Sequence, residues 1–133
     1  MTAFNSIAII GKYLNQSALQ MMQTDLADLA RHLASKNITV WVEEHTAIGA
    51  ELNGFNTAKL EDIGAKADLA IVMGGDGTML GIGRQLAGSK VPLVGVNLGR
   101  LGYMTDIPIQ DVKTVLTEII AGHYEADELS LIH

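Results

Sequence analysis

The sequence predicts an α/β domain in which helices flank a parallel sheet, and two observations support this prediction. Short, nearly continuous apolar runs recur along the chain, and segments with helical periodicity separate them. Such runs suit strands that are buried on both faces, as the strands of a parallel sheet are. Strands that alternate with helices are joined by right-handed crossovers, so one sheet with helices around it is the expected architecture.

Four segments are expected to form the strands of this sheet. They run through residues 6–10, 38–42, 68–73 and 92–96. The second segment is rich in β-branched and aromatic residues, which favour strands. The fourth begins with a proline, and a strand tolerates proline at its first position. The third is the clearest of the four, and it leads directly into a glycine-rich segment.

Helices are expected between these strands. Apolar residues at spacings of three and four from Leu19 to Leu33 predict an amphipathic helix of roughly five turns, and Asn37 is a suitable residue to end it. The same criterion predicts helices over residues 79–86 and 112–120. A shorter helix is expected over residues 60–67.

Three other segments give weaker signals. The stretch 44–57 is polar, contains two glycines and is interpreted as a loop without an assigned role. Thr105 and Asp106, ahead of Ile107 and Pro108, resemble the start of a helix. The last residues, 123–133, have the alternation of an extended segment, so the domain is expected to span residues 1–122 and the rest to form a tail.

Composition limits the classes of protein that fit. A chain of 133 residues with 48% hydrophobic residues suits one globular domain and excludes general disorder. No run approaches the ~20 apolar residues of a membrane span, and the N-terminus lacks the features of a signal peptide. Because the chain has no cysteine, a disulfide framework and a thiolate metal site are excluded, and a cytoplasmic location is expected.

The charge pattern limits the partners. The formal net charge is -6, and the 9 Lys and Arg residues are scattered singly. A nucleic acid or an anionic membrane is therefore not expected as a partner, because no basic stripe follows the chain. A small polyphosphate ligand remains compatible with this charge, since backbone amides and a metal ion can hold it.

The glycine-rich segment after the third strand is Gly-Gly-Asp-Gly-Thr, residues 74–78. In open α/β sheets, ligands bind beyond the carboxyl ends of the strands, where this segment is expected to lie. Its glycines allow a ligand to approach the backbone closely, and the free amides of the following helix attract anions. The dinucleotide pattern G-x-G-x-x-G is excluded because Leu80 replaces its last glycine, and no Gly-Lys-Ser/Thr ending of a P-loop is present.

Asp76 at the centre of this segment needs an explanation, because a carboxylate next to phosphates is repelled. It could coordinate a magnesium ion that the phosphates share, or accept the proton of a hydroxyl that attacks a γ-phosphate. A helix cap is the plainer interpretation, although a cap does not need three flanking glycines. The residues alone leave these roles open.

Residues 74–78 resemble the signature shared by NAD kinases, by diacylglycerol and sphingosine kinases, and more distantly by phosphofructokinases. The segment 97–106, Asn-Leu-Gly-Arg-Leu-Gly-Tyr-Met-Thr-Asp, narrows this choice. It is similar to the NAD kinase segment in which an asparagine, two glycines, an aromatic residue and Thr-Asp recur. With the ending Gly-His-Tyr at 122–124, the resemblance covers essentially the whole chain and is nearest to bacterial NAD kinases.

The resemblance implies an activity and a set of site residues. The family transfers the γ-phosphate of ATP to the adenosine 2′-hydroxyl of NAD and makes NADP with a divalent metal, which would be Mg²⁺. Asp76 would be the general base. No direct protein cluster for the metal is expected, because the four histidines have no metal-ligand spacing. The implied nucleotide-binding residues are Gly74, Gly75, Asp76, Gly77, Thr78, Asn97 and Tyr103, with Arg100 and Arg84 as candidate phosphate contacts.

The resemblance also implies what this chain lacks. NAD kinases have a second, β-rich domain that contributes an Asn-Glu pair and another glycine-rich segment to the NAD site, and that drives oligomer formation. The chain is therefore expected to be the Rossmann-like N-terminal domain, inactive or weakly active by itself, from an enzyme that is a homo-oligomer when complete. Two alternatives remain open: a lipid kinase domain, and a non-catalytic nucleotide-binding module that regulates another chain.

Overall fold

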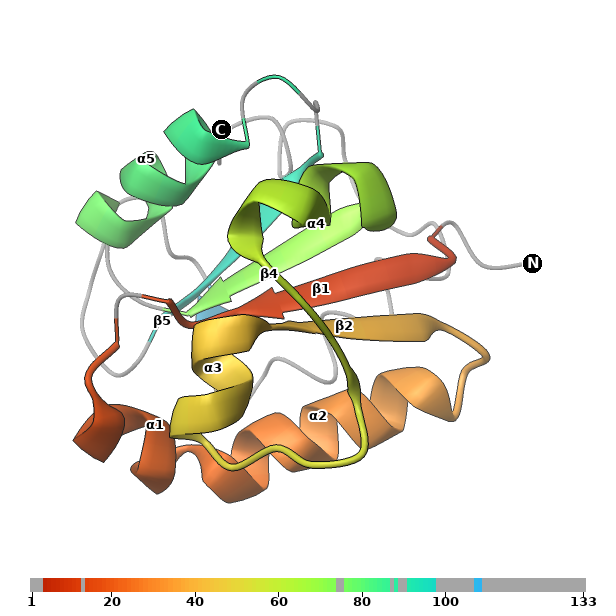
Figure 1. Cartoon of the computed structure of the whole chain (residues 1–133), viewed down its shortest axis with the longest axis vertical. Helices are drawn as coiled ribbons and strands as arrows, with labels where there is room; N and C mark the ends of the chain where they lie inside the picture. Colours follow the sequence, from red (N-terminus) through yellow and green to blue (C-terminus); the bar gives the residue numbers. More distant parts are fainter. Residues whose placement is uncertain are drawn as a thin grey trace.

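The computed structural model describes residues 4–12, 14–73, 76–86, 88, 91–97 and 107–108. These residues form a parallel sheet with helices on both sides (Figure 1). All four predicted strands are confirmed: β1 (Ser6–Ile10), β2 (Thr39–Glu43), β4 (Leu69–Met73) and β5 (Leu93–Asn97). The α/β class that the sequence predicts is therefore correct.

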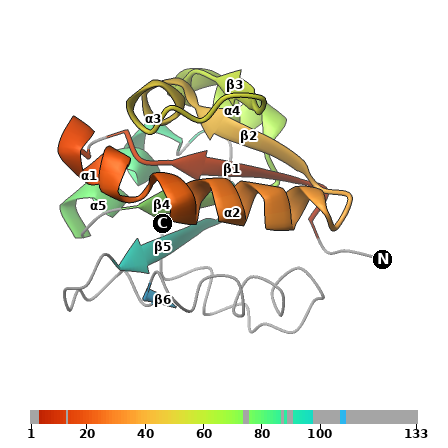
Figure 2. The same cartoon turned by 90° about the horizontal axis from the view of Figure 1, so that it is seen from below.

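The described sheet has six strands in the order β3-β2-β1-β4-β5-β6, and every neighbouring pair is parallel (Figure 2). From β1 the chain moves outward to β2 and β3. It then crosses back to β4, on the other side of β1, and continues outward to β5 and β6. The direction of winding thus reverses between β1 and β4, and such a reversal opens a crevice at the carboxyl ends of the two strands.

The core explains why the strand signals were strong. All five residues of β4 are buried, as are four of the five residues of β1. Both strands are central in the sheet and are covered from both sides, so neither has the alternating polar positions of a half-exposed strand. Helices α1 (Gln16–Met21) and α2 (Gln23–Ala34) cover one side, and α4 (Leu60–Lys66) and α5 (Asp76–Gln85) cover the other (Figure 1).

The helix predicted from Leu19 to Leu33 is two helices in the structure. The Asn15 side chain caps α1 by accepting a hydrogen bond from the backbone N–H of Ala18 at 2.8 Å. Met22 separates α1 from α2 with a backbone ψ of 2°, outside the helical range. After α2, Asn37 has a φ of 64°, which confirms its predicted role, because asparagine adopts the left-handed conformation more readily than most residues.

The structure corrects two sequence interpretations. The stretch 44–57 is not a plain loop, because it contains helix α3 (Glu44–Gly49) and begins strand β3 (Asn56–Ala58). The helix start expected at 105–108 is also wrong, since Ile107–Pro108 form strand β6 and pair with β5. Proline is compatible with this position because β6 is the last strand in the described order. The predicted helix 112–120, the tail 123–133 and the domain boundary between them lie outside the described residues.

Two glycines in helices should respond oppositely to alanine. A Cβ at Gly49, the last residue of α3, would overlap with Cδ1 of the buried Leu19 side chain, so Gly49→Ala should destabilise the protein by about 1–2 kcal/mol. In α5, a Cβ at Gly83 would meet only Leu93 Cδ1 at 3.7 Å, which is ordinary contact. Gly83→Ala should therefore stabilise by up to about 1 kcal/mol through helix propensity. Urea unfolding of both variants tests the contrast, and equal effects would contradict it.

Candidate functional site

The predicted catalytic residue lies at the carboxyl edge of the sheet. Helix α5 begins at Asp76, three residues after Met73 ends β4. Met73 is paired with Val96 of β5, and the next residue, Asn97, is the last residue of that strand. Since neighbouring parallel strands are about 5 Å apart, the register places the backbone of Asn97 beside the carboxyl end of β4. The start of α5 at Asp76 and the end of β5 at Asn97 are thus both at the carboxyl edge of the sheet.

The other predicted site residues divide into three groups. Gly77 and Thr78 follow Asp76 in the first turn of α5. Arg84 is exposed in the last turn of the same helix, about 12 Å from Asp76 by the helical rise, so it faces solvent away from the start of α5. Outside the described residues lie Gly74, Gly75, Arg100 and Tyr103.

The end of β1 adds residues that the sequence did not point to. Ile10 of β1 is paired with Val72 of β4, so Gly11 and Lys12 come level with the end of β4. The backbone N–H of Gly11 donates a hydrogen bond of 2.6 Å to Thr46 Oγ1 of α3. This bond joins the carboxyl end of β1 to the helix that follows β2.

A buried hydrogen-bond network anchors this junction. Thr46 Oγ1 donates to Glu43 Oε1 at 2.8 Å, and the backbone N–H groups of Thr46 and His45 donate to Oε1 and Oε2 at 3.1 and 2.7 Å. Thr46 has no exposed surface, and Glu43 is 3% exposed. The carboxylate therefore caps α3, and with the Thr46 hydroxyl it fixes Gly11 relative to β2. No buried side-chain nitrogen or oxygen of the described residues lacks a partner.

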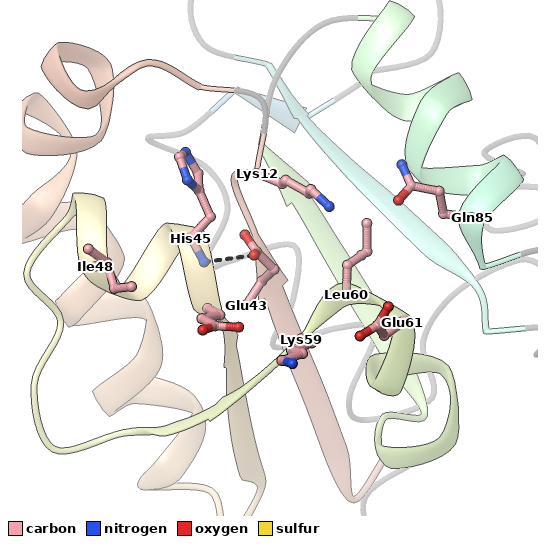
Figure 3. Close-up of a pocket in the computed structure, with 9 residues that line it drawn as sticks. Lys12, Glu43, His45, Ile48, Lys59, Leu60, Glu61 and Gln85 are labelled. Atoms are coloured by element: carbon pink, nitrogen blue, oxygen red, sulfur yellow. Dashed lines mark hydrogen bonds between the residues drawn. The ribbon is translucent and has the colours of Figure 1, made fainter.

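A cavity of about 410 Å³ opens beside this network. It lies among the ends of the first strands, the starts of α3 and α4, and α5 (Figure 3). Its lining residues come from four separate segments of the chain and carry both signs of charge. They are Lys12, Glu43, Glu44, His45, Ile48, Lys59, Leu60, Glu61 and Gln85.

The described residues form neither a metal-binding cluster nor a membrane-spanning helix. In this part of the chain, no three His, Asp or Glu side chains are grouped so that they could hold a metal ion. None of the described helices is both long and apolar enough to cross a membrane.

Sequence reasoning missed Lys12, Glu43 and Thr46. One signal was available for Lys12, because it comes directly after the glycine that ends the first strand, at the edge where ligands of such sheets bind. No comparable signal existed for the other two. Their role depends on a contact between Gly11 and Thr46, which are 35 residues apart in the chain.

The strand order and the start of α5 beyond β4 are those of a doubly wound α/β domain, a class of protein that binds ligands at the carboxyl edge of its sheet. Residues 7–124 match the family described as the ATP-NAD kinase N-terminal domain. The chain belongs to this family.

Similar proteins agree with this assignment. The chain is 44% identical to the NAD kinase of Cupriavidus pinatubonensis over 131 residues, which cover 98% of this chain and 42% of that protein. It is 43% identical to the NAD kinase of Nitrosospira multiformis over 132 residues, which cover 99% of this chain and 44% of that one. The chain thus spans less than half the length of these relatives.

A solved structure supports the fold independently. The crystal structure of yeast NADH kinase complexed with NADH superposes with a TM-score of 0.71 over 90% of this chain and 38% of the yeast chain. The sequence identity is 21%, so this likeness concerns the fold.

Proposed function

We propose that the full-length protein is an NAD kinase that transfers the γ-phosphate of ATP to the adenosine 2′-hydroxyl of NAD. The observation that carries this proposal is the position of Asp76. It is the first residue of α5, directly beyond β4 and beside the winding reversal, in a chain of the ATP-NAD kinase family. A carboxylate at this place can reach a hydroxyl group that is bound at the edge of the sheet.

In the proposed reaction, Asp76 is the general base. Its carboxylate accepts the proton of the 2′-hydroxyl while that oxygen forms a bond to the γ-phosphorus of ATP. The bond from the γ-phosphorus to the oxygen bridging it to the β-phosphate breaks, and ADP leaves. Because phosphoryl transfer depends mainly on positioning and charge stabilisation, the neighbouring backbone amides are expected to contribute as much as the base.

The remaining residues have binding roles in this proposal. Gly74, Gly75, Gly77 and Thr78 let the nucleotide lie against the backbone at the start of α5, whose free amides favour its negative charge. Asn97 contributes a hydrogen bond from the end of β5. We also propose that Tyr103 stacks on the adenine, that Arg100 contacts a phosphate and that Mg²⁺ accompanies ATP and reduces its charge.

The alternatives are less well supported. A lipid kinase domain fits residues 74–78 alone, whereas the family match covers residues 7–124 and the relatives described above are named NAD kinase. A non-catalytic module would keep nucleotide binding without turnover.

The direct test is to incubate the full-length protein with ATP, Mg²⁺ and NAD, and to identify the product. We expect NADP, detected with a dehydrogenase that accepts NADP and not NAD, and a phosphate at the adenosine 2′ position by ³¹P NMR. Diacylglycerol and sphingosine serve as competing acceptors. Phosphorylation of either lipid in place of NAD, or nucleotide binding without any product, would refute the proposed function.

A further inference from the structure

We propose that Lys12 binds the phosphate chain of the phosphoryl donor. This phosphate site lies on the β1 side of the winding reversal. This inference rests on the proposed function, because it names the donor contact of the same site. The donor is ATP or inorganic polyphosphate. Both present a chain of negatively charged phosphates that a lysine ammonium group can bind.

Lys12 is in the right place for this role. It follows Ile10 by two residues, and Ile10 is paired with Val72 of β4, while Asp76 follows Val72 by four residues at the start of α5. The carboxyl ends of β1 and β4 therefore lie side by side at one edge of the sheet. A donor with its γ-phosphate near Asp76 has its remaining phosphates within reach of a long cationic side chain on the adjacent strand end.

The backbone that carries Lys12 is held firmly. The preceding residue, Gly11, is buried and donates its N–H to the buried hydroxyl of Thr46, which in turn donates to Glu43. A Cβ at Gly11 would lie 3.2 Å from Leu19 Cδ2 and 3.4 Å from Thr46 Cγ2, so this turn is closely packed. A fixed attachment point lowers the entropy that Lys12 loses when it binds an anion.

Among the described residues, no carboxylate forms an ion pair with Lys12. The side chain is half-buried and lines the cavity of about 410 Å³, yet it forms no ion pair with any of the described residues. In a chain with 15 acidic and 9 basic residues, a lysine without a carboxylate partner among the described residues is suited to bind an external anion. Glu43, which lines the same cavity, accepts three hydrogen bonds from His45 and Thr46 and forms no ion pair with Lys12.

The two lysines that line the cavity, Lys12 and Lys59, lie on different sides of it. Figure 3 shows the Lys12 side chain extending toward Gln85 of α5, whereas Lys59 lies on the opposite side near Glu61. The carboxylates of Glu43, Glu44 and Glu61 also line the cavity and repel phosphates. Gln85 is the last residue of α5, so the proposed phosphate contact needs the Lys12 side chain to turn from Gln85 toward the start of the helix at Asp76.

The test compares charge-removing and charge-keeping variants in the full-length protein. Lys12→Gln should raise KM about tenfold for whichever donor is used, ATP or inorganic polyphosphate, and should leave KM for NAD unchanged. Lys12→Arg should stay within about threefold of the wild type, because it keeps the charge. Lys36→Gln is the matched control, since Lys36 is exposed in the turn before β2, at the opposite edge of the sheet.

Several results would overturn this assignment: an unchanged donor KM in Lys12→Gln, an increase in KM for NAD instead, or an equal effect of Lys36→Gln. Calorimetric titration with a non-hydrolysable ATP analogue and Mg²⁺ separates this inference from the proposed function. If the wild type fails to phosphorylate NAD but binds the analogue, a tenfold weaker Kd in Lys12→Gln would still support the phosphate contact. Equal Kd values in the wild type and this variant would refute it.

Discussion

Replacing Asp76 with Asn in the full-length protein should lower kcat for NAD phosphorylation by a factor of about 10² to 10⁴. The amide has nearly the same shape as the carboxylate but cannot accept the proton of the 2′-hydroxyl. Since the nucleotide is held by backbone amides and other side chains, KM for NAD should change far less than kcat. Initial rates of NADP formation at saturating ATP measure both constants.

A matched variant distinguishes loss of the base from loss of any carboxylate. Asp62 is exposed in the first turn of α4, so Asp62→Asn removes the same charge without touching the carboxyl ends of β4 and β5. We expect it to keep the wild-type kcat. Thermal unfolding of Asp76→Asn should also match the wild type within about 0.5 kcal/mol, apart from the small loss of a favourable charge at the start of α5. An Asp76→Asn enzyme with more than a tenth of the wild-type kcat would exclude Asp76 as the base.

The predictability of each strand follows from its burial. Strands β1 and β4 lie in the middle of the sheet with helices on both sides, so nearly every residue in them had to be apolar, and their sequences show this directly. Strand β3 has three residues, of which Asn56 and Thr57 are exposed. Backbone pairing with β2 defines it, and such pairing leaves no hydrophobic pattern.

Helix α3 was missed for a related reason. It has six residues, starts immediately after β2 and contains the exposed Ile48, whose side chain is 72% accessible. Glu43 caps it, although glutamate is not among the residues that mark helix starts in sequences. A short helix without an apolar stripe or a typical cap is formed by tertiary contacts, which a single sequence does not display.

Only the part of the candidate site that lies at the ends of β4 and β5 was predictable from the sequence. The glycines around Asp76 at the end of an apolar run identified the connection between β4 and α5, and the strand ending at Asn97 identified its neighbour. Lys12 depends on strand order, because only the placement of β1 next to β4 brings it to this edge. Thr46 depends on one hydrogen bond across 35 residues. The sequence signal for Lys12, its place after the glycine that ends the first strand, becomes informative only once the strand order is known, and Thr46 has no such signal.

The network around Thr46 should be the most sensitive polar feature of the described core. Thr46→Val keeps the volume of the side chain but removes the hydroxyl that accepts from Gly11 N–H and donates to Glu43. The buried Gly11 N–H then has no acceptor, and the buried carboxylate of Glu43 loses one of its donors. Leaving buried groups unsatisfied costs about 1–3 kcal/mol each, so the free energy of unfolding should fall by about 2–4 kcal/mol.

Thr39→Val provides the matched control for this prediction, because Thr39 is the exposed first residue of β2 and valine favours strands. Its free energy of unfolding should stay within about 0.5 kcal/mol of the wild type. Urea unfolding measures both variants, and a shift in the midpoint without a change in slope would attribute the loss to the native state. If Thr46→Val were as stable as Thr39→Val, the hydroxyl would not be needed to hold the end of β1, and Lys12 would lack the fixed attachment proposed for it.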